Sequence, residues 1–219
     1  MSADYERQLL ARARELADLD DIKDDVLGCL GGARHAGLDP EAITGLVGCA
    51  VALGATSVET YTADEGWSGQ HADERAFLGH IASIEDDLAE RLHAISWVGN
   101  QAVVALDRAE TDLEIAVDDL DAARAMPVDE PCTGCHGHRD AAVAKAERAI
   151  AGAQKRISIC ERVIALRGMV TRRLRDALAR LRAVPSDLGE TYESVYNLIR
   201  RGGRMPREGR WITGEEVPA

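Results

Sequence analysis

Apolar residues recur at alternating intervals of three and four along two long stretches in the middle and second half of the chain. The first stretch, about 71–126, contains no proline and two glycines, and the second covers about 139–183. The first seam is Leu92, Ile95, Gly99, Ala102, Leu106, Ala109, Leu113, Ala116, Leu120 and Ala123. The second is Ala146, Ile150, Ala153, Ile157, Cys160, Ile164, Arg167, Thr171, Leu174, Leu178 and Leu181. This spacing predicts two long helices, each with one apolar seam.

The short connection between these stretches predicts an antiparallel coiled-coil hairpin with a definite register. When facing residue numbers sum to about 266, large side chains oppose small ones, as in Leu120 with Ala146 and Leu113 with Ala153. Such alternation permits close interdigitation. The same register places Gly99 beside Arg167, where we expect a close approach or a bend.

Shorter helical patterns flank the hairpin. We expect one helix from about residue 4 to 30, stopped by Gly31 and Gly32, and another from Pro40 to near Gly54. Residues 55–70 have the composition of a loop. A last helix is expected after Pro185, begun by Asp187 and Glu190 at capping-box spacing and ended at Gly202.

The predicted fold class is therefore all-α, a long antiparallel coiled-coil helical hairpin with N-terminal helices and a short C-terminal helix. Along the sequence this gives an N-terminal helical region at 1–70 and a hairpin at 71–184, with its tip at 127–138. A C-terminal helix and an Arg-rich tail follow at 185–219. Of the 219 residues, 46% are hydrophobic but one alone is Phe, which suits slim helix packing better than a broad sheet core.

Charge separates the two arms of the hairpin. Residues 81–126 hold 11 acidic and 3 basic residues, whereas 139–183 hold 4 acidic and 12 basic ones. Opposite charge favours pairing of the two arms within one chain over pairing of like arms between chains. The net charge of −12 disfavours nonspecific nucleic-acid binding by the body of the protein.

No apolar run reaches the ~20 residues that span a bilayer, and the first residues lack a basic segment followed by an apolar one. We therefore expect a cytoplasmic protein that does not associate with a membrane. Five cysteines in such a protein are better explained as thiols or metal ligands than as disulfides. The apolar neighbours of Cys29 and Cys49 predict core thiols, and Cys160 falls on the predicted seam.

The chemistry of the chain concentrates at the hairpin tip, where Cys132 and Cys135 are separated by two residues. Zn²⁺ prefers thiolate and imidazole ligands, and this spacing lets both sulfurs reach one ion. His138 is the natural third ligand. The fourth is open among His136, Glu130, Asp129 and a group from another molecule. The prediction is a structural zinc ion that fixes the turn.

Two other chemistries fit the same residues. A bare Cys132–Cys135 dithiol would make the protein a thiol redox sensor. The run from Cys132 to His136 also has the spacing used for covalent haem attachment, but that attachment normally follows export, and a hairpin tip offers a haem little cover.

Locally, Cys132, Cys135 and the flanking arms resemble the zinc hook of Rad50-type proteins, in which two such tips share one zinc ion through four sulfurs. This chain lacks a phosphate-binding loop, so the resemblance does not imply an ATPase. His136 and His138 depart from the hook pattern, which leaves a site within one chain open as well. The last 90 or so residues, from Cys132 to Trp211, also resemble a group of uncharacterised actinobacterial proteins, some of them on mobile elements.

No catalytic signature accompanies these features, so a non-enzymatic structural, assembly or adaptor protein is the leading prediction. Its partner would be another protein or a second copy, held through the hairpin tip. The alternative is a nucleic-acid-associated accessory factor of a phage or mobile element. That alternative rests on a basic tail comprising Arg200, Arg201, Arg204, Arg207, Arg210 and Trp211. The same arginines could instead bind the acidic helices of their own chain.

Overall fold

The computed structural model describes residues 3–35, 37–38, 40–56, 74–127 and 133–201. Within these ranges the regular structure is all helical, as the sequence predicts. The helices are α1 (Ala3–Ala17), α2 (Asp20–His35), α3 (Pro40–Ala52), α4 (Glu74–Ala125), α5 (Thr133–Asp187) and α6 (Glu190–Arg200). The predicted loop at 55–70 lies almost wholly outside the described residues.

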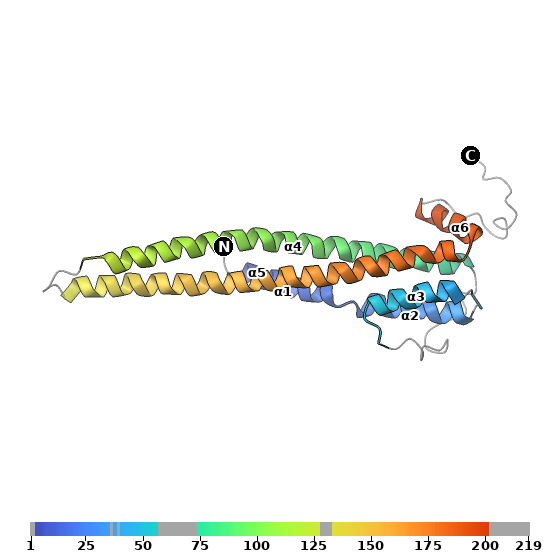
Figure 1. The fold of residues 1–219 in the computed structure, drawn as a ribbon, viewed down its shortest axis with the longest axis horizontal. Coiled ribbons are helices and arrows are strands. Elements are labelled where there is room, and N and C mark those ends of the chain that lie inside the picture. Colours follow the sequence, from blue (N-terminus) through green and yellow to red (C-terminus); the bar gives the residue numbers. More distant parts are fainter. Residues whose placement is uncertain (1–2, 36, 39, 57–73, 128–132, 202–219) are drawn as a thin grey trace. The chain divides into compact units, whose positions relative to one another are not determined.

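The chain divides into two compact units, and the long helices α4 and α5 contribute to both (Figure 1). Unit 1 comprises residues 1–17 and 94–169, and unit 2 comprises 18–93 and 170–219. Each unit therefore assembles segments from distant parts of the sequence.

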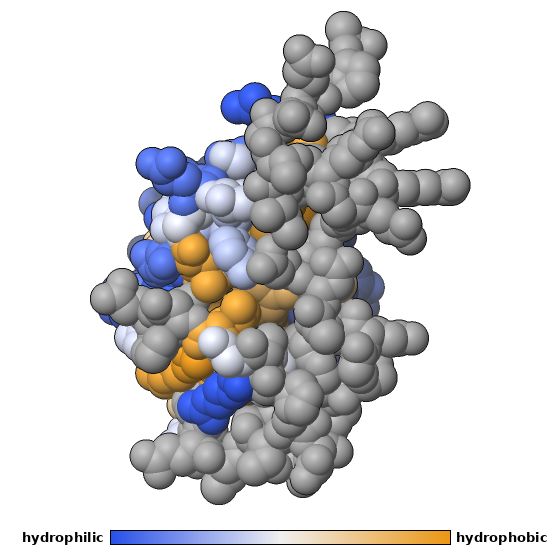
Figure 2. Space-filling view, turned by 90° about the vertical axis from the view of Figure 1, so that its right-hand side faces the viewer, coloured by the Kyte–Doolittle hydropathy of each residue, from blue (hydrophilic) through white to orange (hydrophobic). Residues whose placement is uncertain are grey.

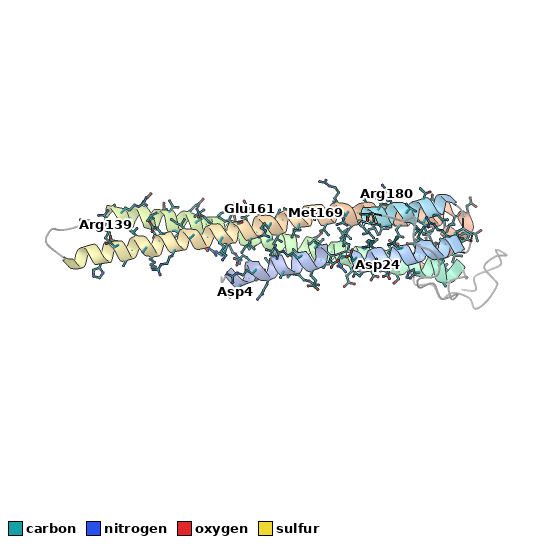
Figure 3. The ribbon with its side chains drawn as sticks, turned by 90° about the horizontal axis from the view of Figure 1, so that it is seen from below. Asp4, Asp24, Arg139, Glu161, Met169 and Arg180 are labelled. Carbon is teal, nitrogen blue, oxygen red and sulfur yellow. The ribbon has the colours of Figure 1, made fainter. Side chains whose placement is uncertain are left out.

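In unit 1, α4 and α5 run antiparallel in the predicted register. A methyl group placed on Gly99 would overlap the side chain of Arg167, which confirms the predicted close approach at that position. Further along, Arg156 of α5 pairs with Asp112 of α4 at 2.7 Å. Figure 3 shows side chains between the paired helices, with Arg139 and Glu161 on α5.

Every position of the predicted seams is buried or half-buried. Ile95, Ala102, Ala109, Ala116, Leu120 and Ala123 of α4, and Ala146, Ala153 and Cys160 of α5, lie in the core of unit 1. A second set of α5 residues, Ile159 and Val163, is also buried. Helix α1 belongs to the same unit, and its residues Leu9, Ala13 and Leu16 are buried too. The Tyr5 hydroxyl of α1 donates a hydrogen bond to the Gln101 side chain of α4 at 3.2 Å.

In unit 2, α2 and α3 form a hairpin that packs on the 170–187 part of α5. Gly45 and Gly48 let α3 approach α5 closely, because a Cβ at either position would lie 3.0 Å or less from Val184 or Arg180 atoms. The carbonyl groups at the C-terminal end of α3 lack partners within the helix, and Arg173 supplies them. Its side chain donates hydrogen bonds to the backbone oxygens of Ala52, at 3.2 Å, and Leu53.

Several predicted helix ends are wrong, and glycine conformation explains two of them. Gly31 and Gly32 do not stop a helix, since both lie inside α2; the turn comes at Gly37, with φ of +69°. Pro185 does not close α5, which continues to Asp187 before Gly189 turns the chain at φ of +108°. Asp187 therefore remains helical and cannot begin the next helix, so the predicted capping box is absent and α6 has Gly189 at its N-cap.

The first predicted helix is also broken, into α1 and α2. The carboxylate of Asp18 accepts a hydrogen bond from the Asp20 backbone N–H at 3.2 Å, which begins a new helix where the periodicity suggested a continuous one.

Candidate metal centre

In the sequence, the candidate zinc ligands fall between the end of α4 at Ala125 and the first two turns of α5. Cys132, Asp129 and Glu130 are outside the described residues. Helix α5 begins at Thr133, about six residues earlier than expected, so positions 135, 136 and 138 are helical. The side chain of His138 is exposed.

Helical geometry distinguishes the two histidines. Residues three apart lie on the same side of a helix, whereas adjacent residues diverge by ~100°. Position 138 therefore shares a helix face with position 135, and position 136 does not. These angular positions around the helix axis favour His138 over His136 as the residue that would bind the same ion as Cys135.

The start of α5 also suits a thiolate. Its first turn contains no acidic residue, and the unpaired N–H groups of a helix N-terminus carry partial positive charge. A thiolate at position 135 would be stabilised there. Elsewhere in the described part of the chain, no group of three or more His, Cys, Asp or Glu residues is placed to hold a metal.

The other three cysteines are free and buried, which confirms the prediction that Cys29 and Cys49 are core thiols. Burial raises the pKa of Cys29, with a further contribution from Cys49, and raises the pKa of Cys49 to about 12. The pKa of Cys160 is raised by burial and then by the nearby carboxylate of Glu6. All three are poor nucleophiles and poor metal ligands.

Of the basic tail, the structure describes Arg200 and Arg201. Arg200 is turned toward α4, where it pairs with Asp86 at 2.6 Å and with Glu85 at 3.5 Å. The hydrogen bond to Asp86 raises the pKa of Arg200. Arg201 is exposed. The candidates Arg204, Arg207, Arg210 and Trp211 lie outside the described residues.

One partner of Arg200, Glu85, belongs to a buried polar cluster in unit 2 that the sequence reasoning missed, whereas the other, Asp86, is exposed. Glu85 is 3% exposed; it accepts a hydrogen bond from Arg182 at 2.7 Å and another from the buried Tyr196 hydroxyl. Burial and the bond to Glu85 raise the pKa of Tyr196. The available signal was the position of Glu85 on the same helix face as Ile81 and Leu88, both fully buried.

Comparison of the chain with protein-family models, curated proteins and solved structures finds no match. Among the described helices, none is both long and apolar enough to cross a membrane. Hydrophilic side chains lie beside hydrophobic ones over the described part of the face in Figure 2.

Proposed function

We propose that the chain is a non-enzymatic assembly or adaptor protein whose helical hairpin is capped by a structural zinc ion. The observation that supports this proposal is the antiparallel pairing of α4 and α5, because the Cys132–His138 segment covers the end of the sequence between these two helices and the start of α5. The metal would be held by Cys132, Cys135 and His138, with His136 or an outside group in the fourth position. It would fix the turn and present a rigid tip to a protein partner in the cytoplasm.

Metal analysis of protein prepared without a histidine tag tests the site. About one zinc ion per chain is expected for a site within one chain, and about half an ion for a site shared between two tips. Cys135→Ser and His138→Ala should each lose the metal. His136→Ala should retain it if the helical phase selects His138, and His93→Ala on α4 is an exposed control.

Less than about 0.2 zinc per chain in protein with reduced thiols would overturn the proposal. A reversible Cys132–Cys135 disulfide under mild oxidant would favour the redox sensor instead. Mass spectrometry of peptides spanning 132–135 distinguishes these outcomes.

Nucleic-acid association is the second candidate, and the described contacts limit what can support it. Arg200 is already paired with Asp86 and Glu85, so binding would depend on Arg201, Arg204, Arg207 and Arg210. Salt-dependent DNA or RNA binding that disappears when these four are changed to Ala would favour it. Absence of binding at low salt would reject it.

A further inference from the structure

The seam between α4 and α5 in unit 1 is covered better on one side than on the other. Its small residues, such as Ala109 and Ala153, are buried. Its large residues are half-buried, namely Leu106 and Leu113 of α4 and Ile150, Ile157 and Ile164 of α5. In an antiparallel pair, heptad spacing places these five side chains along the same side of the hairpin. That side therefore leaves apolar surface in contact with solvent.

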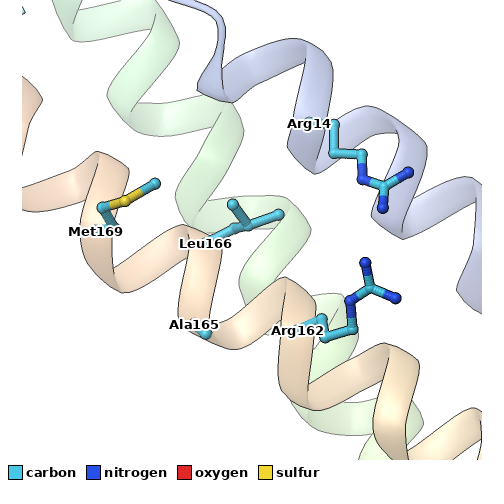
Figure 4. A pocket seen from close by; sticks show the side chains of 5 residues that line it. All are labelled: Arg14, Arg162, Ala165, Leu166 and Met169. Atoms are coloured by element: carbon cyan, nitrogen blue, oxygen red, sulfur yellow. The ribbon is translucent and has the colours of Figure 1, made fainter. Parts of the chain in front are cut away.

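The opposite side of the same two helices is filled by α1. Val163 of α5 is 1% exposed there, and the hydrogen bond from Tyr5 to Gln101 joins α1 to α4. Figure 4 shows Arg14 of α1 across from Arg162 of α5 at the edge of this contact. Helix α1 thus demonstrates that a single helix can pack along the groove between α4 and α5.

Two exposed valines of α4 extend the apolar surface on the uncovered side. Val103 and Val117 are 46% and 41% exposed. Each lies about one helical turn from a half-buried leucine, since Val103 precedes Leu106 by three positions and Val117 follows Leu113 by four. We call the surface formed by the two valines and the five half-buried seam residues the open groove. Large apolar residues gathered on one face mark an interaction surface.

Carboxylates line both edges of the open groove. The heptad positions on this side of the seam, and those one step further out on α4, hold six acidic residues: Asp107, Glu110, Glu114 and Asp121 of α4, and Glu147 and Glu161 of α5. All six are exposed, and none makes an ion pair within the described part of the chain.

The basic residues of the same stretch lie on other faces of the two helices. Helical geometry places Arg108, Lys145 and Arg156 on the side of α1, and Arg148, Lys155 and Arg162 on the face of α5 opposite the seam. Arg124 follows the last acidic residue of the groove, Asp121. The negative charge of the open groove is therefore not balanced by a neighbouring base, and a partner that covers its apolar surface must carry basic side chains at both edges.

We propose that the open groove binds a basic amphipathic helix of a partner protein. A helix fits because α1 already occupies the corresponding groove on the other side. Its apolar face would cover the half-buried leucines and isoleucines, and its Lys and Arg side chains would pair with the carboxylates on either edge. Val103 and Val117 are separated by 14 positions, so the contact is about 21 Å long, the length of a helix of about 14 residues.

The charges and side-chain sizes argue against two other occupants. A nucleic acid would be repelled by the six carboxylates. A second copy of this chain could offer the basic face of α5, but Ala151 and Ser158 lie between its Arg148, Lys155 and Arg162, and such small side chains would leave the apolar surface uncovered. The proposed contact uses the arms of the hairpin and does not depend on a zinc ion at its tip.

Binding of designed helical peptides to the full chain tests the proposal, with EDTA present to remove any contribution of metal. The probe is a labelled peptide of about 21 residues with Leu along one face and Lys on both flanks. We expect a dissociation constant on the order of 10 μM at low salt, which should rise as salt is added. Two matched peptides, one with Glu in place of Lys and one with Ala in place of Leu, should each bind at least about tenfold more weakly.

Two pairs of substitutions locate the binding surface. Glu110→Lys with Glu147→Lys reverses charge on both edges of the open groove, and Val103→Gln with Val117→Gln makes its surface polar. Each pair should weaken binding of the Leu and Lys peptide by at least about tenfold. Asp119→Lys with Glu193→Lys changes two exposed acidic residues outside the groove and is the charge-matched control. Circular dichroism checks that each variant remains helical.

Three results would overturn the proposal. The first is equal binding of all three peptides or of none. The second is binding that survives both groove pairs, or that the control pair weakens as much, since either would show attraction to the acidic protein as a whole. The third is self-association of the chain alone, measured by sedimentation, that both groove pairs abolish, since it would assign the open groove to a second copy.

Discussion

At Gly99 a single residue determines how closely the two arms of unit 1 approach. Its missing side chain leaves room for Arg167, which crosses directly over it. Sequence register alone predicted this pairing, because the glycine on one arm faced the one charged residue of the other seam. A glycine in a helix interior normally costs about 1 kcal/mol relative to alanine, so its presence here indicates a packing requirement.

We expect Gly99→Ala to leave the free energy of unfolding unchanged or lower it, since the gain in helix propensity is opposed by displacement of Arg167. Adding Arg167→Ala should relieve the overlap and recover a gain of roughly 0.5–1 kcal/mol. Urea unfolding of the two single variants and the double variant measures this coupling.

Gly152→Ala is the matched control on α5. Gly152 is exposed, and nothing lies within 4 Å of a Cβ at that position. This substitution should stabilise the protein by roughly 0.5–1 kcal/mol. Equal stabilisation by Gly99→Ala and Gly152→Ala would show that Arg167 does not lie over Gly99.

At the buried cluster of unit 2, we expect Tyr196→Phe to destabilise the protein by about 1–3 kcal/mol, because it removes a hydroxyl donor from a buried carboxylate. Glu85 would retain its bonds to Arg182 and Arg200. Ser194→Ala, at an exposed position of α6, should change the stability by tenths of a kcal/mol at most. Thermal and urea unfolding report the difference, and equal effects of the two variants would argue against the cluster.

Helices were easier to predict than their ends. Seam periodicity predicted α4 and α5 because dozens of residues contribute to it. An end depends on one backbone conformation, and Gly31, Gly32 and Gly37 look equivalent in sequence although only Gly37 among them adopts a positive φ. The break at Asp18 has a sequence signal, because Asp20 and Asp21 are acidic residues of the kind found in the first turn of a helix. That signal was missed because the apolar periodicity continues across the break.

Charge pairing between the arms of unit 1 gives a prediction at the level of α4 and α5. Asp112→Arg should destabilise the hairpin by about 0.5–1 kcal/mol, since it replaces an ion pair with two like charges. Adding Arg156→Asp restores opposite charges and should recover most of the loss. Urea unfolding measures the cycle.

Asp119→Arg controls for the change in net charge, since Asp119 is exposed and has no ion pair with the described residues. It should have a smaller effect than Asp112→Arg. If the double variant were no more stable than Asp112→Arg alone, the Asp112–Arg156 pair would contribute nothing to the hairpin.

The thiols between α2 and α3 predict how stability depends on pH. Folding raises the pKa of Cys49 to about 12 and also raises that of Cys29, whereas an unfolded thiol titrates near ~8.5. Below the unfolded pKa both states are protonated, and the stabilising effect of burial is complete. Above it, the unfolded state releases protons that the folded state keeps, so stability falls as pH rises from ~8.5 toward 12.

The expected slope is up to about 1.4 kcal/mol per pH unit for each thiol. Urea unfolding between pH 7 and 10, in the presence of a reductant, measures it. A variant with Cys29→Ala and Cys49→Ala should show a shallower slope, whatever its stability at pH 7. An unchanged slope would contradict the raised thiol pKa values.

At the scale of the whole chain, the hairpin and its register followed from sequence, but the grouping into two units did not. Heptad spacing specifies which face of α4 meets α5, yet it contains no information on which distant helix covers the remaining faces. Ile159 and Val163 lie outside the predicted seam and are buried in unit 1 with α1, while Glu85 is buried in unit 2 with α6. The metal site at the tip remains a prediction, because its defining residue Cys132 is outside the described part of the chain.

The last prediction concerns the role of α6 in unit 2. A chain ending at Leu188 lacks Tyr196 and Arg200, so Glu85 keeps Arg182 as its described donor. We expect faster hydrogen exchange in α2, α3 and the 74–93 part of α4, because unit 2 loses a buried aromatic side chain and two partners of a buried carboxylate. Exchange in residues 100–125 and 140–160 of unit 1 should stay the same.

A chain ending at Arg201 is the matched reference, since it differs from the shorter one by residues 189–201, which contain α6. Exchange measured by mass spectrometry on both chains isolates the contribution of that helix. If exchange accelerated equally in both units, α6 would stabilise the molecule as one cooperative body, and the division into two units would not describe its unfolding. Acceleration confined to unit 2 would show that α6 stabilises that unit alone, through its contacts with the buried Glu85 of α4.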